Sequence, residues 1–425
     1  MQAAGLSALA LGRALLHGNG SKGLGAVAAA APRWFSAQPS PEEGDRAAEF
    51  LHTFRAADLL IERSTVQQPP INLEDLKFGT VFTDHMLHIE HSVTEGWTRP
   101  TVKPFGLLQM HPASQVLHYG MCCFEGMKAY AGVDGRMRLF RPEMNMERLR
   151  RSARRLQLAD FDPQELLSCL KQLLLVDRSW LPAREGYSIY VRPFMFSSAN
   201  ALGVAKPART TLSVLLSPVG PYFPTGLKPI ALFVDELHRR AWPGGVGDVK
   251  VGGNYAPTIH PQVEAAARYG TPQVVYCFRE STEHPDHAQF EECGSMNLFF
   301  HLQQRDGRRV LVTPPLTGTI LPGITRDSIL TLARQWGDCE VQERPVTIAE
   351  VREASSEGRL LELFGSGTAC IVQPVGSLIR SNGEVYTTRL SPETDPGASL
   401  AVRLQRSLLD IQYGRTEHPW SVAVE

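Results

Sequence analysis

The sequence predicts an α+β protein with two domains, mixed or antiparallel sheets, and a cleft near the segment that joins the domains. Its 425 residues are enough for two or three domains with large cores. Apolar residues make up 43% of the chain and charged residues 20%, which is ordinary for a globular protein. Strand-like runs and helical segments are interspersed in both halves, and these patterns are the basis of the fold prediction.

Charge and composition exclude several classes of function. The net charge of −1 provides no field for a polyanion, so nucleic acid is not an expected partner. No apolar run approaches the ~20 residues that cross a bilayer, so no membrane interaction is expected. The seven cysteines contain no Cys-x-x-Cys pair, which argues against disulfide staples and a zinc ribbon. The histidines in Asp84–His91 match no standard metal spacing, and we expect a strand or turn with exposed histidines and no metal.

The N-terminus differs in composition from the rest of the chain. Residues 1–41 contain no Asp or Glu, but they carry Arg13, Lys22 and Arg33 among many Ala, Leu, Gly and Ser residues. This composition predicts that residues 1–35 are a mitochondrial presequence, cleaved after Phe35, and that the mature protein resides in the mitochondrial matrix. The alternative is a disordered, alanine-rich tail.

The first half is predicted to contain an arm and the smaller domain. Residues 36–75 are polar and form the arm, with a helix at Ala47–Leu60. Residues 76–220 form the small N-terminal domain. Its predicted strands are Val81–Thr83, Arg138–Phe140, Tyr187–Phe196 and Thr210–Ser217, and its predicted helices are Met146–Leu156 and Leu166–Leu174. Proline and glycine cluster in Pro218–Gly226, and residues 221–229 are predicted to be the interdomain linker.

Residues 230–425 are predicted to form the larger domain. Its predicted strands are Ile230–Val234, Gln273–Phe278, Met296–Phe300 and Val310–Thr313. Its predicted helices are Asp327–Trp336, Ile348–Ser355 and Ala398–Leu409. The polar segment Glu280–Gln289 is predicted to be a surface loop.

One lysine in this half stands out. The segment Gly247–Tyr255 places Lys250 between a glycine-bearing turn and a second pair of glycines. A lysine held where backbone packs closely is a poor choice for a solvated charge, and a good choice for an amine that attacks a carbonyl. The alternative is an ordinary loop lysine, because mixtures of glycine and lysine are common in loops.

Three features downstream of Lys250 bear on its chemistry. Glu292 precedes a glycine turn and an apolar strand, so it is either a buried carboxylate that needs a partner or an exposed acid at the end of a loop. The segment Pro314–Arg326 leads into a helix whose first amides suit a phosphate, with Thr325 adding a hydroxyl. Alternatively, Thr325 is a simple N-cap. The turn Gly365–Ala369 offers another group of amides and a hydroxyl to an anion.

A lysine, a buried acid and two turns that suit a phosphate together fit one cofactor, pyridoxal phosphate. The lysine binds the aldehyde, the acid keeps the ring nitrogen protonated, and the turns hold the phosphate.

Longer motifs extend this match from about Phe78 to Tyr413. They are Phe78–Met86, Leu117–Gly120, Phe124–Tyr130, Leu139–Pro142, Tyr190–Pro193 and Pro218–Pro224. On these motifs the chain resembles fold-type IV pyridoxal-phosphate enzymes, specifically the eukaryotic branched-chain-amino-acid aminotransferases. The resemblance implies a smaller N-terminal α/β domain, a larger C-terminal domain with pseudo-barrel sheets like that of D-amino-acid aminotransferases, and a homodimer.

The resemblance also assigns the groups that contact the cofactor ring. It implies that Lys250 is the catalytic lysine that condenses with the aldehyde. Glu292 would partner the pyridine nitrogen, and Tyr255 would hydrogen-bond the phenolic oxygen.

The phosphate group falls to a second set of residues. The resemblance implies contacts with Arg148, with the backbone amides of Ile324 and Thr325, with the Thr325 hydroxyl, and with Thr368. Arg148 has an alternative role, because the basic run Arg148–Arg155 also suits a solvated helix face.

For the substrate, the family pattern points to a pocket of aromatic and polar residues. They are Phe78, Tyr119, Phe124, Tyr190, Arg192, Tyr222, Thr368 and Ala369. The period of a strand places Tyr190 and Arg192 on one face. An inward arginine is costly in an apolar pocket unless an anion visits it, and the side-chain carboxylate of glutamate is such an anion. Alternatively, Arg192 pairs with a neighbouring acid.

The resulting prediction is a branched-chain-amino-acid transaminase. It would transfer the amino group of L-leucine, L-isoleucine or L-valine reversibly to 2-oxoglutarate, with Lys250 moving the proton. The alternatives are another enzyme of the same fold, either a D-amino-acid aminotransferase or an aminodeoxychorismate lyase, and a non-catalytic phosphate-binding or interaction protein that kept the scaffold.

Overall fold

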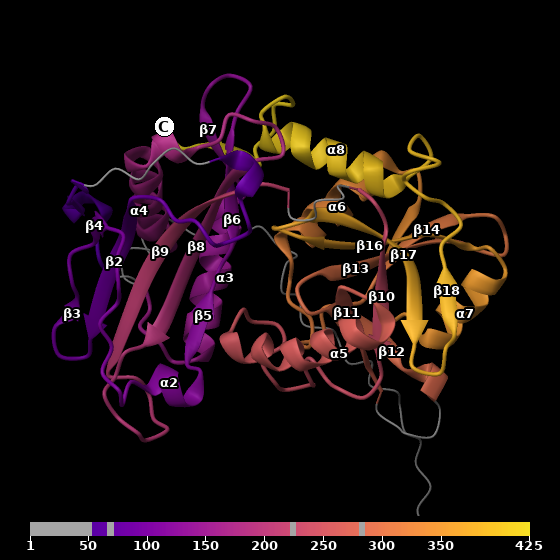
Figure 1. Ribbon diagram of the computed structural model, residues 1–425, viewed down its shortest axis with the longest axis horizontal. Helices are drawn as coiled ribbons and strands as arrows, with labels where there is room; N and C mark the ends of the chain where they lie inside the picture. The colour runs from indigo at the N-terminus through magenta and orange to yellow at the C-terminus, as the bar shows by residue number, and fades with distance from the viewer. Residues whose placement is uncertain (1–52, 66–71, 222–226, 280–284) are drawn as a thin grey trace, which may run out of the picture. The chain divides into compact units, whose positions relative to one another are not determined.

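The computed structural model describes residues 53–65, 72–221, 227–279 and 285–425. The predicted presequence and the first part of the predicted arm lie outside these residues. Residues Phe50–Glu425 form one compact unit, and two sheets with their covering helices make up its described part (Figure 1). No helix among the described residues combines the length and apolarity that crossing a bilayer requires.

The first sheet is mostly antiparallel. Its main path runs β1-β4-β2-β9-β8-β6-β7-β19, with β3 paired to β2 and β5 paired to β8. The strands are β1 (Leu60–Ile61), β2 (His85–Ser92), β3 (Gly96–Trp97), β4 (Thr101–Pro104), β5 (Cys122–Phe124), β6 (Met127–Ala131), β7 (Met137–Phe140), β8 (Ser188–Ser197), β9 (Arg209–Val219) and β19 (Ser421–Ala423). The short helix α2 (Gln115–Tyr119) precedes β5.

Two helices, α3 (Pro142–Arg155) and α4 (Pro163–Val176), pack on this sheet. Each begins with proline, which is tolerated where the first amide has no partner in the helix. Met146, Leu149 and Ala153 repeat at helical spacing on α3 and are buried against strand residues such as Ile89 and Val191. The helical periodicity therefore predicted both helices correctly.

The second sheet closes on itself. Its path runs β12-β11-β10-β17-β16-β13-β14-β15, and β12 also pairs with β13, so the strands from β12 to β13 form a closed ring. The strands are β10 (Ile230–Asp235), β11 (Gln273–Phe278), β12 (Gln289–Cys293), β13 (Asn297–Gln303), β14 (Arg309–Thr313), β15 (Glu340–Glu343), β16 (Leu360–Gly367), β17 (Ile371–Arg380) and β18 (Val385–Thr387). This ring confirms the expected pseudo-barrel.

Helices cover parts of the barrel's outer face. They are α5 (Ile259–Tyr269), α6 (Ile324–Trp336), α7 (Ile348–Ser356) and α8 (Leu400–Gln412). Successive residues of β13 point to opposite faces, so Leu298 and Phe300 join one core cluster while Phe299 packs with α6 and α8 in another. Burial on both faces explains why β13 is a continuous apolar run.

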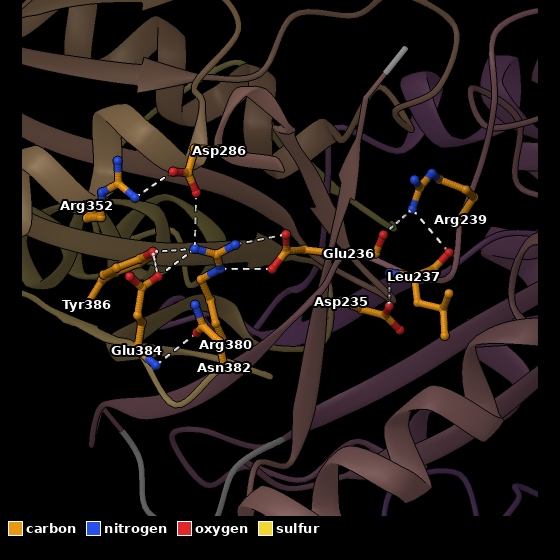
Figure 2. A network of polar contacts seen from close by, with 10 residues as sticks. All are labelled: Asp235, Glu236, Leu237, Arg239, Asp286, Arg352, Arg380, Asn382, Glu384 and Tyr386. Carbon is orange, nitrogen blue, oxygen red and sulfur yellow. Dashed lines mark hydrogen bonds and ion pairs between the residues drawn. The ribbon is translucent and has the colours of Figure 1, made fainter. Parts of the chain in front are cut away.

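A network of charges ties the end of β17 to its neighbours. Figure 2 shows Arg380 bonded to Glu236, which follows β10, to Asp286 in the short helix η6 (Pro285–His287), and to Glu384 and Tyr386. The Arg380 side chain is buried, and these acids and the phenol supply its partners. Removing one partner would leave charge uncompensated in the interior.

Several predicted elements differ from the structure. Residues 81–83 form no strand, and β2 begins at His85 instead. Of the predicted arm helix Ala47–Leu60, residues 47–52 lie outside the described part; the rest has only the turn Ala56–Asp58 before Leu60 opens β1. There the Leu60 amide bonds the Pro100 carbonyl, so pairing with a distant segment replaces the local helix.

The histidines predicted to be exposed are not on the surface. His85 is buried and its Nδ1 lies 2.6 Å from the Asp177 carboxylate, while His88 and His91 are half-buried. The reason is that β2 lies between β4 and β9 rather than at an edge. Within the described residues, no group of three or more His, Cys, Asp or Glu side chains is arranged to hold a metal.

Two predicted loops are shorter than expected. Residues 280–284 lie outside the described part, but Pro285–His287 is helical and Gln289 already pairs with Phe278 as the start of β12. Pro218 and Val219 belong to β9, and residues 222–226 of the predicted linker lie outside the described part. The domain boundaries stay a prediction, although β19 returns from the C-terminus to pair with β7.

Candidate active site

A cavity of about 270 Å³ lies where residues of the first sheet meet residues of the barrel. Phe124, Gly126, Tyr190 and Arg192 line it from the first sheet. The barrel side contributes the end of β12, the start of α6 and the turn between β16 and β17. Most of the residues singled out from the sequence meet here. They are Phe78, Phe124, Arg148, Tyr190, Arg192, Lys250, Tyr255, Glu292, Ile324, Thr325, Thr368 and Ala369.

Lys250 is held by its own backbone. Its amide donates to Ser152 Oγ of α3 at 2.9 Å, and its carbonyl accepts from the Phe124 amide at 3.0 Å. The flanking Val249 and Val251 are buried in the core of the first sheet. In an extended segment this alternation directs the Lys250 side chain the other way, into the cavity.

The glycines around Lys250 permit this packing. A Cβ on Gly247 would lie 2.4 Å from the Thr319 carbonyl oxygen, and one on Gly252 would lie 2.6 Å from Cys122 Sγ. The close approach of backbone inferred from the sequence is therefore present. Only glycine fits at these two positions without moving a neighbour.

Aromatic side chains surround the Lys250 amine. Nζ donates to the Tyr255 hydroxyl at 3.0 Å and lies 5.0 Å from the centre of the Phe124 ring. The Phe124 and Tyr255 rings are themselves 4.9 Å apart. The phenol is thus fixed beside the amine, at the position where a group condensed with that amine would carry its own polar atoms.

Glu292 enters the cavity from β12 and is buried, as one of its two interpretations required. Oε1 accepts from the Leu321 amide at 2.8 Å, and Oε2 accepts from Asn297 Nδ2 at 3.0 Å. Burial raises the pKa of Glu292, and the nearby Arg240 guanidinium opposes that rise. The carboxylate is therefore fixed in direction, and it is suited to accept a proton or a strong hydrogen bond from a ligand.

Arg240 is the partner that the sequence did not identify. Its NH1 lies 2.6 Å from Glu292 Oε1 and donates to the Thr319 carbonyl at 3.1 Å. The sequence signal was indirect: a buried acid requires a partner, and Arg239-Arg240 enters the apolar stretch Ala241-Trp242. Nothing in that signal distinguishes Arg240 from the chain's many other arginines.

The start of α6 forms the end of the cavity suited to an anion. Its N-cap is Gly323, which has no side chain to bond the first amides, and Ile324 and Thr325 begin the helix at the cavity wall. The alternative of Thr325 as N-cap is therefore wrong, because Thr325 lies inside the first turn. Ser366 Oγ, in the same cavity, is buried without a hydrogen-bond partner. Uncapped amides and spare hydroxyls are the donors that a phosphate needs.

Arg148 completes this end of the cavity, and it is buried rather than part of a solvated face. Its Nε and NH2 donate to the two Glu125 oxygens at 2.6 and 3.0 Å, and NH1 donates to the Pro322 carbonyl at 2.9 Å. Asn145 also donates to Glu125 at 2.8 Å. Burial favours the neutral acid, but Arg148 outweighs burial and lowers the pKa of Glu125. Sequence reasoning missed Glu125 and Asn145.

The side chains expected to contact substrate form one wall. Tyr190 and Arg192 lie on the same face of β8, as predicted, and Phe78 packs edge-on against Tyr190 with ring centres 4.8 Å apart. Arg192 Nε is buried without a partner, and NH2 reaches only the Tyr190 hydroxyl at 3.4 Å. No acid among the described residues pairs with Arg192, so the ion-pair alternative does not hold there.

The turn after β16 carries Thr368 and Ala369 into the cavity. The buried Lys128 of β6 donates from Nζ to the Ala369 carbonyl at 2.7 Å, which ties this turn to the first sheet. Ile371 follows with φ of 63°, a left-handed conformation that a β-branched residue rarely adopts. Such strain persists only where the surrounding contacts fix the backbone.

Two predicted substrate residues are not brought into this cavity. Tyr119 ends α2 on the surface, where its hydroxyl bonds the Leu202 carbonyl, and it does not line the cavity. The cause is that α2 is anchored beside β8 by Gln115, which bonds Ser197 and Gly203. Tyr222 lies outside the described residues.

The donors present fit pyridoxal phosphate. An amine and a phenol lie together, a buried carboxylate lies in the same cavity, and uncapped helix amides, an arginine and an unpartnered serine hydroxyl form an anion site. Lys250, Tyr255 and Glu292 would hold the ring, and the α6 start with Arg148 would hold the phosphate.

Comparison with known proteins gives matches over most of the chain. The family model described as amino-transferase class IV matches residues 122–378. The cytosolic branched-chain-amino-acid aminotransferase of Mus musculus is 45% identical over 385 residues, or 90% of this chain and 97% of that protein. The mitochondrial branched-chain-amino-acid aminotransferase of Mus musculus is 47% identical over 373 residues, or 87% of this chain and 92% of that protein.

Solved structures agree with these matches. The crystal structure of the Escherichia coli branched-chain amino acid aminotransferase is 26% identical, covers 81% of this chain and 100% of its own, and has a TM-score of 0.64. A second bacterial-type structure, a branched-chain amino acid aminotransferase complexed with N-(5'-phosphopyridoxyl)-L-glutamate, is also 26% identical, with the same coverage and a TM-score of 0.61.

Proposed function

This chain belongs to the amino-transferase class IV family, and we propose that it transfers the amino group of L-leucine, L-isoleucine or L-valine reversibly to 2-oxoglutarate. The products are a branched 2-oxo acid and L-glutamate, and pyridoxal phosphate is the cofactor. The observation that carries the proposal is the position of Lys250 Nζ beside the Tyr255 hydroxyl, in one cavity with the buried Glu292 carboxylate.

Each residue has a task in this reaction. When bound, pyridoxal phosphate supplies an aldehyde that takes the amino group and a ring that accepts electrons from the substrate α-carbon. Lys250 Nζ moves the proton at that carbon, and Tyr255 orients Nζ through its hydroxyl. Glu292 holds the ring nitrogen in its protonated form.

Substrate recognition in this proposal needs one pocket for two kinds of side chain. Phe78, Phe124 and Tyr190 offer apolar surface to a branched aliphatic side chain. Arg192, whose Nε is buried without a partner, offers charge to the distal carboxylate of glutamate or 2-oxoglutarate. The guanidinium lies 4.8 Å from the Phe124 ring centre, so apolar and charged surfaces adjoin.

The proposal includes a homodimer. Large apolar side chains are exposed near α2 and the loop before β9; they are Leu107, Leu117, Leu202 and Val204. A contiguous apolar surface of this kind is typical of an assembly face. Tyr119 lies on the same region, so a partner chain would cover it, and sedimentation equilibrium tests this assembly.

A mitochondrial matrix location is part of the proposal. Its support is the absence of acids from residues 1–41 together with Arg13, Lys22 and Arg33. The relatives include both a cytosolic and a mitochondrial protein at similar identity. Cell fractionation of the full chain, and of a chain that begins after Phe35, tests the assignment.

The reaction is tested with purified protein. We expect a visible absorption band after incubation with pyridoxal phosphate, loss of that band on adding L-leucine, and glutamate formation once 2-oxoglutarate is present. D-leucine and aminodeoxychorismate are the matched controls, and they should give no product. Turnover of either control but not of L-leucine would instead favour another enzyme of this fold.

A further inference from the structure

Arg240 is the cation in direct contact with the buried acid of the active site. It follows β10 through a turn in which Asp235 accepts from the amides of Leu237 and His238 at 2.8 and 2.9 Å. This turn leads into the buried Arg240, whose NH1 reaches Glu292 Oε1 at 2.6 Å and the Thr319 carbonyl at 3.1 Å. The contact therefore joins the exit of one barrel strand to the carboxylate on another.

Other charges face Glu292 but none of them touches it. Arg326 on α6 is bonded to the Pro314 carbonyl and to Glu343, and Lys250 is bonded to Tyr255. Glu291, the neighbour of Glu292 on β12, adds an acid whose Oε2 has no partner. Burial raises the pKa of Glu292, and among the groups that lower it Arg240 has the largest effect.

Neutral groups already fix the geometry of this carboxylate. The Leu321 amide and Asn297 Nδ2 each bond one oxygen of Glu292. Asn297 in turn donates to the Leu321 carbonyl at 2.9 Å, which closes the arrangement. Arg240 is therefore not needed to aim Glu292, and its distinct contribution is positive charge in an interior site.

We propose that Arg240 is a positioning residue that keeps the Glu292 carboxylate ionised in the empty and the loaded site, so that Glu292 binds the cofactor ring only in its nitrogen-protonated form. This inference rests on the proposed function, because it assumes that the ligand of the cavity is pyridoxal phosphate. A neutral Glu292 would donate rather than accept, and the ring would then lose the charge that favours electron withdrawal.

The test compares Arg240→Met, Arg240→Lys and Arg239→Met as cofactor-free proteins titrated with pyridoxal phosphate at pH 6, 7, 8 and 9. Arg239 is the matched control, because it is half-buried and donates only to the backbone carbonyls of residues 236–238 (Figure 2). The affinity is read from absorbance, and the pH profile of kcat/KM for L-leucine is read separately.

Arg240→Met should bind the cofactor at least about tenfold more weakly at pH 6, because a pKa rise of one unit in Glu292 corresponds to a tenfold change. The loss should shrink toward pH 9, where Glu292 ionises without help. The acid limb of kcat/KM should move to higher pH in Arg240→Met, Arg240→Lys should recover most of both effects, and Arg239→Met should match the wild type.

A loss that is equal at every pH and unrelieved by lysine would mean a structural role and would overturn the proposal. So would wild-type affinity in Arg240→Met. If Arg240→Met does not fold, Arg240→Met/Glu292→Gln removes both charges and keeps the test open. This double variant should bind no more weakly than Glu292→Gln alone, and additive losses would refute the coupling. Failure of the wild type itself to bind pyridoxal phosphate would count against the proposed function.

Discussion

The Lys250 amine donates a hydrogen bond to the Tyr255 hydroxyl across 3.0 Å, and the two residues are separated by one short turn, η4 (Gly252–Asn254). A backbone that packs too tightly for a Cβ at Gly247 and Gly252 sets their distance. The nucleophile and the group that orients it are therefore placed by one local segment. The remaining parts of the site come from elements far away in the sequence.

Replacement of Lys250 tests the covalent role of this amine. Lys250→Ala should abolish the visible band of the bound cofactor and reduce turnover of L-leucine below detection, because no other lysine lines the described cavity. Absorbance after gel filtration and glutamate release measure the two effects. Lys206→Ala is a control at an exposed lysine and should behave as the wild type. Wild-type turnover in Lys250→Ala would refute the assignment.

The buried pair of Arg148 and Glu125 is expected to carry a large cost when it is broken on one side. Arg148→Met leaves Glu125 charged and enclosed, which should destabilise the fold by roughly 3–5 kcal/mol and weaken phosphate binding. Thermal unfolding and titration with pyridoxal phosphate measure both. Arg154→Met, on the exposed side of the same helix, should cost at most ~1 kcal/mol. A smaller cost at Arg148 than at Arg154 would contradict this account.

Glu291 gives a dependence of stability on pH. Burial raises its pKa from 4.5 to about 7, so between these values the folded state holds a proton that the unfolded state releases. Stability is therefore lost as pH rises through this window, by on the order of 3 kcal/mol in total at about 1.4 kcal/mol per pH unit.

Glu291→Gln removes this titration and keeps the size of the side chain. Its unfolding midpoint should lie close to that of the wild type near pH 4.5 and clearly above it at pH 8. Differential scanning calorimetry at both pH values, with saturating pyridoxal phosphate, measures the difference. Equal midpoints at pH 8 would show that Glu291 is ionised without cost in the folded protein.

Arg192 is expected to separate the two kinds of substrate. Arg192→Met should raise KM for 2-oxoglutarate about 10- to 100-fold, the equivalent of a charge-assisted hydrogen bond of about 1.5–3 kcal/mol. KM for L-leucine should change little, because leucine has no distal charge. Steady-state kinetics with each substrate varied in turn provides the measurement, and leucine is the internal control. An equal rise for both substrates would place Arg192 at a group that they share.

Gly323 links the start of α6 to the acid of the site. A Cβ at this position would lie 2.0 Å from Asn297 Oδ1, and Asn297 holds Glu292 through its amide nitrogen. Gly323→Ala should therefore displace Asn297, cost about 1–3 kcal/mol of stability and lower cofactor affinity. Gly397→Ala is the matched control, since nothing lies within 4 Å of its added Cβ. Unchanged affinity in Gly323→Ala would mean that Asn297 is not required to hold Glu292.

Local patterns in the sequence were sufficient where the cause is local. Helical spacing located α3 and α4, and the glycines beside Lys250 indicated close packing that the structure contains. Tyr190 and Arg192 share a face because a strand has a period of two. The predicted strand at residues 81–83 failed because apolar composition alone does not show which segment finds a partner.

The sequence by itself determined which side chains carry reactive groups, which segments are helical or extended, and the family to which the motifs belong. The tertiary structure alone decided the partners of the buried charges: Glu125 for Arg148 and Arg240 for Glu292. It also left Tyr119 outside the cavity, because α2 is anchored beside β8. The physical reason is that an ion pair depends on which distant elements become neighbours, and no periodicity within one segment encodes that distance.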